Sequence, residues 1–245
     1  MKTIRVILII YIAMIDFLSG EDVHAQSIQL SHIERIIGFP SAEPGIEKGV
    51  SACFAGTVGN MLLMAGGCNF PNKPAAEGGE KRFYQGIYAA QITDNNELHW
   101  RCIGQLPAPC AYGVSIPLEK GLLCIGGNNT QENFATAFVI TIKEGKACIE
   151  NYPTLPTKMD NFTGAHYNQH VIVSNGLQLF ELDLEHIELG WHALQPLTTK
   201  KLGQPISAFV DGSFCQWGGC TPKTETELTA LNIAGQSLAH PLKEL

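Results

Sequence analysis

The sequence predicts an all-β protein, a β-propeller assembled from four-stranded blades. One observation is a double glycine that closes an apolar run three times, at 66–67, 126–127 and 218–219. A second is the recurrence of four short apolar runs around each of these glycine pairs, with a period near 50 residues. A third is the strand-like alternation of apolar and polar residues, as in 177–182. With 45% hydrophobic and 16% charged residues, the 245-residue chain has ample material for a packed core.

The first 25 residues differ from the rest of the chain. Lys2 and Arg5 precede an apolar run over 6–15, and a small-residue cleavage site follows at 23–25. That run is about half as long as the roughly 20 residues that cross a bilayer. We therefore expect a cleaved secretory signal peptide over 1–25 and a periplasmic or secreted propeller domain over 26–245 that does not contact a membrane. A membrane anchor is the alternative interpretation.

Each repeat begins with two apolar runs that flank a tight turn. The three clearest turns are at 59–60, 119–121 and 211–212, and a double glycine ends each of these pairs of runs. A third repeat over 162–176 is weaker, because Asn175-Gly176 stands in place of the double glycine. The third runs are predicted at FYQGIYAAQI, ATAFVITI, LQLFELDL and LTALNI.

A fourth run follows in three of the four repeats. These runs are HWRCIGQLP, ACIENYPTLP and GWHALQPL, and the last repeat, which ends at LTALNI, lacks one. This pattern is typical of a kelch blade, a thin twisted sheet that needs neighbours on both faces. The glycines suit backbone that turns sharply or approaches a neighbour too closely for a Cβ atom. No α-helix is predicted after the signal peptide.

The number of blades leaves two arrangements open. The segment SIQLSHIERIIGFP, residues 27–40, resembles a fourth strand and could complete the last blade, which would close a four-bladed ring. Otherwise the ring stays open and its terminal blades expose apolar faces and strand edges. Low stability or self-association through those edges would then be expected.

Charge and cysteine content exclude some functions. A net charge of -7 with 16 Lys and Arg residues leaves no basic stripe, so no nucleic-acid partner is predicted. Cys53, Cys124 and Cys215 lie in apolar runs, which favours buried small side chains over a disulfide framework for the eight cysteines. Since there is neither a C-x-x-C pair nor a histidine cluster beside them, no metal site is predicted.

Several stretches resemble the cyclically permuted mutarotase family, the kelch-repeat relatives of N-acetylneuraminate epimerase. They are GVSACFAG, MAGGCNFP, AAEGGEKRFYQGIYAA, LPAPCAYGVS, CIGGNNTQ and WGGC, and the likeness is strong over 33–164 and patchy to about 235. The resemblance implies a periplasmic six-bladed propeller that interconverts the α and β anomers of sialic acid. It also implies acid–base ring opening and closure without a cofactor.

The chain departs from the family at its catalytic motif. The G-E-x-K-P-G-x-R pattern that the resemblance leads us to expect is absent, and the four arginines all lie within the first 101 residues. The nearest comparable segment, WGGCTPKTETEL, offers only Lys223. We therefore assign no catalytic residue from sequence and expect a shortened member that lacks two blades. The alternative function is a non-catalytic propeller remnant that binds a sugar or a protein.

The longest loop, residues 68–82, carries most of the candidate binding residues. A sugar acid needs a cation for its carboxylate, a role for Lys81 or Arg82, and polar partners for its hydroxyls, such as Glu77. Asn69 begins the same loop. A solvated loop is the alternative. The other candidates lie after the second double glycine or close to it: Asn128 and Asn129, which could instead only form the turn, and Tyr112, which could stack on a sugar or pack between blades.

Overall fold

The computed structural model describes residues 37–91, 97–221, 223–224, 228–232 and 237–240, with side chains described up to residue 221. The chain divides into two compact units, Met1–Arg35 and Ile36–Leu245, and all described residues belong to the second. The expected signal peptide and residues 27–36 lie outside the described residues. No helix in the described part of the chain has the length and apolarity that a membrane crossing requires.

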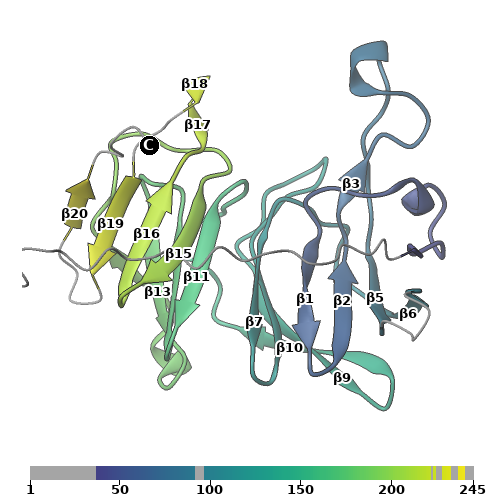
Figure 1. The fold of residues 1–245 in the computed structure, drawn as a ribbon, viewed down its shortest axis with the longest axis horizontal. Helices are drawn as coiled ribbons and strands as arrows, with labels where there is room; N and C mark the ends of the chain where they lie inside the picture. The colour runs from purple at the N-terminus through teal and green to yellow at the C-terminus, as the bar shows by residue number, and fades with distance from the viewer. Residues whose placement is uncertain (1–36, 92–96, 222, 225–227, 233–236, 241–245) are drawn as a thin grey trace, which may run out of the picture. The chain divides into compact units, whose positions relative to one another are not determined.

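The second unit holds four antiparallel sheets of four strands each, which we number as blades 1 to 4 in chain order (Figure 1). Their strands are, for blade 1, β1 (Phe54–Val58), β2 (Met61–Ala65), β5 (Gly86–Ala90) and β6 (Arg101–Gln105); for blade 2, β7 (Val114–Leu118), β8 (Gly121–Ile125), β9 (Ala137–Lys143) and β10 (Lys146–Tyr152); for blade 3, β11 (Thr163–Tyr167), β12 (His170–Ser174), β13 (Leu179–Asp183) and β14 (His192–Leu194); and for blade 4, β15 (Ile206–Val210), β16 (Ser213–Trp217), β19 (Leu228–Asn232) and β20 (Ser237–His240). The prediction of an all-β propeller with about four blades is confirmed.

Short elements complete the described fold. Two small ribbons extend the double-glycine loops of blades 1 and 4: β3 (Cys68–Asn69) with β4 (Arg82–Phe83), and β17 (Cys220–Thr221) with β18 (Lys223–Thr224). Figure 1 shows β3 and β17 rising from the same side of the blades. Helical backbone in the described residues is confined to three 3-10 turns, η1 (Ile46–Lys48), η2 (Ala75–Glu77) and η3 (Ile187–Leu189).

The expectation that the last repeat lacks a fourth strand was wrong. Strand β20 pairs with β19, with Leu228 opposite His240. Sequence reasoning missed it because SLAH is short and half polar, so it does not register as an apolar run. Blade 4 therefore needs no strand from residues 27–40. The described end of that segment lies beside blade 1 instead, where Ile37 forms a parallel bridge with Glu97 and accepts a hydrogen bond from the Leu98 N–H group at 2.7 Å.

The blades stack through their innermost strands. Strand β1 packs beside β7, β7 beside β11, and β11 beside β15. No comparable packing joins β15 back to β1 within the described residues. Among the described residues the four blades therefore form an open series, in which blades 1 and 4 each contact one other blade.

The second double glycine lies where backbone segments approach too closely for a Cβ atom, as predicted. Gly126 and Gly127 have φ angles of 59° and 99°, in the left-handed region. A Cβ atom on Gly126 would lie 2.6 Å from the carbonyl oxygen of Met159, on the segment that leads into blade 3. One on Gly127 would lie 2.7 Å from the carbonyl oxygen of Ala111 in its own blade. Any side chain at either position would push apart two backbone segments.

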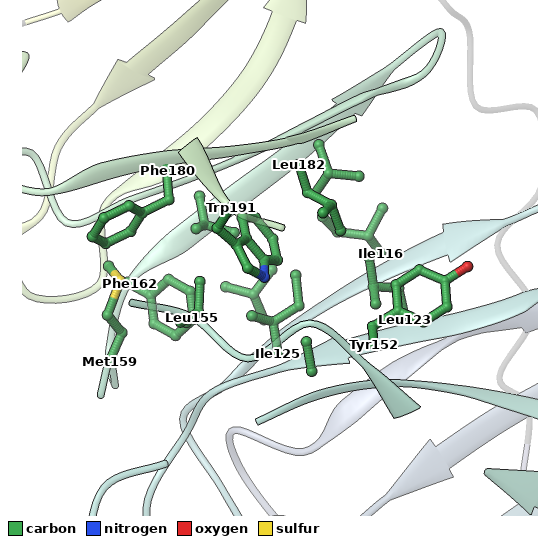
Figure 2. Close-up of a cluster of buried hydrophobic side chains, with 14 of the residues drawn as sticks. Ile116, Leu123, Ile125, Tyr152, Leu155, Met159, Phe162, Phe180, Leu182 and Trp191 are labelled. Atoms are coloured by element: carbon green, nitrogen blue, oxygen red, sulfur yellow. The ribbon is translucent and has the colours of Figure 1, made fainter. Parts of the chain in front are cut away.

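The largest core cluster fills the space between blades 2 and 3 (Figure 2). Leu123 and Ile125 from β8 and Leu182 from β13 are fully buried in it. Trp191 closes the cluster and donates a hydrogen bond from its indole N–H group to the carbonyl oxygen of Pro153 at 2.7 Å. This interface buries apolar area from both sheets, which neither blade could cover alone.

The segment before β1 covers the outer side of blade 1. Ile46 is fully buried there against Met64 and two tyrosines of the blade. The carboxylate of Glu43 accepts hydrogen bonds from the N–H group of Gly86 at 2.8 Å and from the hydroxyl of Tyr88 at 2.9 Å. Burial, with Glu43 next to it, raises the pKa of Tyr88. The first blade is thus capped by its own chain.

All eight cysteines lie among the described residues and all are free thiols. Cys124 is completely buried, as predicted, whereas Cys53 and Cys215 are only partly buried. Burial raises the pKa of the Cys110 thiol to about 12 and that of Cys124 well above its ordinary value. Cys68, Cys110 and Cys124 therefore serve as small core side chains, and the cysteines form no disulfide framework.

Candidate functional site

Each blade begins with a residue in the left-handed backbone conformation, two positions before its innermost strand. These residues, with their φ angles, are Ala52 (57°), Tyr112 (62°), Asn161 (52°) and Gln204 (55°). Three of them are joined to the preceding member by a backbone hydrogen bond. The N–H group of Tyr112 donates to the carbonyl of Ala52 at 2.9 Å, Asn161 donates to Tyr112 at 2.9 Å, and Gln204 donates to Asn161 at 2.7 Å.

This ladder of hydrogen bonds lies at the double-glycine end of the blades. In blades 1, 2 and 4 the residue before the left-handed position forms a bridge with the residue after the glycine pair: Ser51 with Cys68, Ala111 with Asn128, and Gly203 with Cys220. Side chains from the ladder, the 68–82 loop and the glycine loops therefore converge at one end of the molecule. Convergent loops from several repeats are a common setting for ligand binding.

A cleft of about 450 Å³, which we call cleft A, opens at this end between blades 1 and 2. Blade 1 contributes Glu80, Lys81 and Arg82 from the strand β4 side of the long loop. Blade 2 contributes the segment 129–131, which follows its double glycine. Pro109, from the segment that joins β6 to β7, also lines the cleft. The cleft thus combines two cationic side chains, one carboxylate and several polar groups.

Lys81 is held in place by aromatic rings. Its ammonium group donates a hydrogen bond to the hydroxyl of Tyr112 at 2.9 Å and lies 4.9 Å from the centre of that ring. The ring centre of Phe70 is 5.5 Å away on another side. The hydrogen bond to Tyr112 is the main cause of a raised pKa for Lys81. The side chain therefore presents a positive charge throughout the neutral pH range.

Arg82 supplies the second positive charge. It lies on β4 opposite Asn69, and its guanidinium carbon is 5.6 Å from the ring centre of Tyr84. Among the described residues, no carboxylate lies within ion-pair distance of its guanidinium group. A guanidinium group that packs on a ring keeps its N–H groups available for a planar anion such as a carboxylate.

The structure brings three of the six sequence-predicted binding residues to cleft A, namely Lys81, Arg82 and Asn129. Glu77 is exposed at the end of η2 and does not line the cleft. Asn69 has a structural role, since its amide donates to the carbonyls of Gly45 and Gly49 at 2.8 and 2.7 Å.

The two asparagines after the second glycine pair also stabilise local structure. The side-chain oxygen of Asn129 accepts the N–H groups of Gln131 and Glu132 at 2.8 and 3.0 Å, which closes the turn that the sequence allowed for. The amide of Asn128 donates to the carboxylate of Asp160 at 2.8 Å. Asn129 therefore reaches cleft A as part of a rigid turn, whereas Asn128 joins blade 2 to blade 3.

Sequence reasoning missed Glu80 and the polar cluster around Asp160. Besides Asn128, the carboxylate of Asp160 accepts the side-chain amides of Asn133 at 2.9 Å and Asn161 at 2.8 Å, and the Lys201 ammonium is 3.9 Å away. A second cleft of about 450 Å³ lies beside this cluster, lined also by Gln204 and Cys220. An alignment of the four repeats would have singled out Asp160. The other repeats have Ser51, Ala111 and Gly203 at the equivalent position, so Asp160 is the one charged residue among the four.

No group of three or more His, Cys, Asp or Glu side chains in the described part of the chain is arranged to hold a metal ion. Cleft A is instead suited to a small organic anion with hydroxyl groups, because it offers two cations, a carboxylate and amides within one cavity.

A sequence model of the family described as N-acetylneuraminate epimerase matches residues 18–149, more than half of the chain. The chain belongs to the N-acetylneuraminate epimerase family. The matched region includes blade 1, its long loop and nearly all of blade 2, and hence every residue named above for cleft A.

Curated N-acetylneuraminate epimerases agree with this assignment over part of their length. The protein of Yersinia enterocolitica is 36% identical over 108 residues, which cover 40% of this chain and 26% of that protein. The Vibrio vulnificus protein is 33% identical over 94 residues, 37% of this chain and 24% of its own length. N-acetylneuraminate epimerase 1 of Escherichia coli is 34% identical over 111 residues, 43% of this chain and 28% of that protein. The chain spans about a quarter of the length of these relatives.

A solved structure titled "Structure of YjhT" supports the fold. It superimposes with a TM-score of 0.60 over 77% of this chain and 68% of that structure, at 10% sequence identity. At this identity the likeness bears on the arrangement of strands alone. It agrees with the propeller architecture described above.

Proposed function

We propose that this protein binds N-acetylneuraminate in cleft A and interconverts its α and β anomers. The observation that carries the proposal is the convergence of Glu80, Lys81 and Arg82 in one cleft inside the region that matches the epimerase family. The leader-like composition of residues 1–25 supports a site of action outside the cytoplasm, where free sialic acid would be encountered.

The two cations hold the substrate in this proposal. N-acetylneuraminate carries a carboxylate on its anomeric carbon, and Arg82 can bind both carboxylate oxygens with its planar fork. Lys81 adds a second charge, which its bonds to Tyr112 keep in position. Fixing the carboxylate places the anomeric hydroxyl and the ring oxygen, both attached to the same carbon, beside Glu80.

Glu80 then moves the proton. Its carboxylate takes the proton from the anomeric hydroxyl, the bond between the anomeric carbon and the ring oxygen breaks, and a ketone forms at that carbon. The carboxyl group returns the proton to the departing ring oxygen, so Glu80 is regenerated. Rotation of the open-chain carbonyl and the reverse reaction produce the other anomer. A positioned proton transfer of this kind contributes about 10²–10⁴-fold in rate.

The test follows the decay of freshly released α-N-acetylneuraminate to the β anomer by proton NMR. We expect acceleration over buffer, a loss of about 100-fold or more in Glu80→Gln, and retained binding in that variant by saturation-transfer NMR. Lys81→Gln and Arg82→Gln should weaken binding. Lys73→Gln and Glu77→Gln are the matched controls, since both residues lie in the same loop but do not line cleft A. Wild-type rates equal to buffer would refute the enzymatic proposal.

A second candidate function is sialic acid binding without catalysis. It is favoured by the absence of the G-E-x-K-P-G-x-R motif and of any arginine after Arg101. The same experiment separates the two functions. Binding that depends on Arg82 without anomer exchange supports the second candidate, and no binding at all removes both.

A further inference from the structure

The hydrogen-bond ladder accounts for the backbone of Tyr112 but not for its side chain. Ala52 holds the equivalent position in blade 1, and its carbonyl accepts the ladder bond from Tyr112 although its own side chain is only a methyl group. The ladder therefore requires a left-handed backbone and no particular side chain. A φ of 62° is unfavourable for a residue as bulky as tyrosine, and residues held in this way are frequent at functional sites.

Packing between the blades does not account for this tyrosine either. Tyr112 is only partly buried and belongs to none of the hydrophobic clusters in the described part of the chain. Its ring lies against the ammonium group of Lys81, which is 4.9 Å from the ring centre. The ring of Phe70 lies near the same ammonium group, at 5.5 Å. The hydroxyl of Tyr112 and the ammonium of Lys81 are thus held together beside cleft A, which Lys81 lines.

The hydroxyl of Tyr112 still has a proton to donate. An ammonium group can only donate, so the phenolic oxygen is the acceptor in its 2.9 Å bond with Lys81. The O–H group has no acceptor among the described residues. A hydroxyl that accepts from an ammonium group becomes a stronger donor, because the two bonds polarise each other. Lys81 and Tyr112 can therefore offer an N–H and an O–H group to one acceptor that lies beside both.

We propose that Tyr112 binds the substrate carboxylate directly, through its O–H group and together with Lys81. This rests on the proposed function, because it takes the ligand of cleft A to be a sugar acid. A carboxylate has two oxygens with about four lone-pair sites. The planar fork of Arg82 occupies one site on each oxygen, and Lys81 and Tyr112 occupy the remaining two.

This set of groups also determines specificity. Arg82 and Lys81 can only donate, and the oxygen of Tyr112 already accepts from Lys81. The site therefore favours an ionised carboxylate over a carboxamide of the same shape, because the N–H groups of an amide would face donors. In the wild type, the carboxamide of N-acetylneuraminate should bind about tenfold or more weakly than the acid. A carboxamide that binds as tightly as the acid would contradict the proposed set.

Tyr112→Phe removes the hydroxyl and keeps the ring that contacts Lys81. Calorimetric titration of the full chain with N-acetylneuraminate should give a dissociation constant about tenfold or more above that of the wild type, because a hydrogen bond to a charged group is lost. Tyr152→Phe is the matched control. The ring of Tyr152 also lies 4.9 Å from an ammonium group, that of Lys120, but it does not line cleft A. This control should bind like the wild type, and urea unfolding verifies that both variants are folded.

A Lys81→Gln background separates direct contact from an effect on Lys81. If Tyr112 contacts the carboxylate, Tyr112→Phe should weaken binding in that background as well, by about threefold or more. An effect that disappears in that background would mean that Tyr112 acts only through Lys81, and it would overturn the proposal. Unchanged binding in Tyr112→Phe alone would also overturn it. These outcomes apply to a wild type that binds; a wild type that binds no N-acetylneuraminate refutes the proposed function itself.

Discussion

Replacing Gly126 with alanine tests the role of the double glycines in joining the blades. At a φ of 59°, an alanine costs about 1–2 kcal/mol in the left-handed conformation. Its Cβ atom would also lie 2.6 Å from the carbonyl oxygen of Met159. Overpacking of this kind costs a further 1–3 kcal/mol or so. We therefore expect the free energy of unfolding to fall by about 2–5 kcal/mol.

Gly145→Ala is the matched control for this prediction. Gly145 also has a positive φ, 74°, but a Cβ atom there would meet nothing within 4 Å. The control should lose only the conformational part, about 1–2 kcal/mol. Urea unfolding followed by tryptophan fluorescence measures both variants, with unchanged slopes indicating the same folded and unfolded states. If the two variants differ by less than about 0.5 kcal/mol, blade contact does not explain the double glycine.

Two further predictions concern the cap of blade 1 and the buried thiols. Glu43→Gln should lower the free energy of unfolding by about 1–3 kcal/mol, because it weakens charge-assisted hydrogen bonds to blade 1. Glu185 is exposed, so the control Glu185→Gln should change the free energy of unfolding little. Urea titration of both variants measures the difference. Burial raises the pKa of the Cys110 thiol from its ordinary value of 9.0 to about 12. As pH rises, the thiol of the unfolded chain therefore loses its proton before that of the folded chain. Stability should be full below pH 9 and fall between pH 9 and 12, and Cys110→Ala should lessen that fall in urea titrations across this range. An identical pH slope in the variant would contradict the assignment.

The sequence predicted the blades because their signals are local. Strand alternation and turn glycines act within a few residues of the chain, so the double glycines and the tight turns could be recognised in isolation. The strand β20 escaped because its four residues carry little apolar signal, and only pairing with β19 defines it. The loop 68–82 was predicted as a candidate binding segment, and the structure places part of it in cleft A. Which of its residues line the cleft could not be predicted from sequence: Glu80 was missed, and Asn69 instead bonds to the backbone of Gly45.

The sequence by itself determined a repeated β architecture, membership of a family and two cations on one long loop. Only the tertiary structure decided that Lys81 is held by Tyr112 and that Asn128 bonds to Asp160. The physical reason is the range of the interactions. Hydrogen-bonding and packing partners that lie 30 or so residues apart leave no periodic trace in the chain, and become neighbours only when one blade stacks on the next.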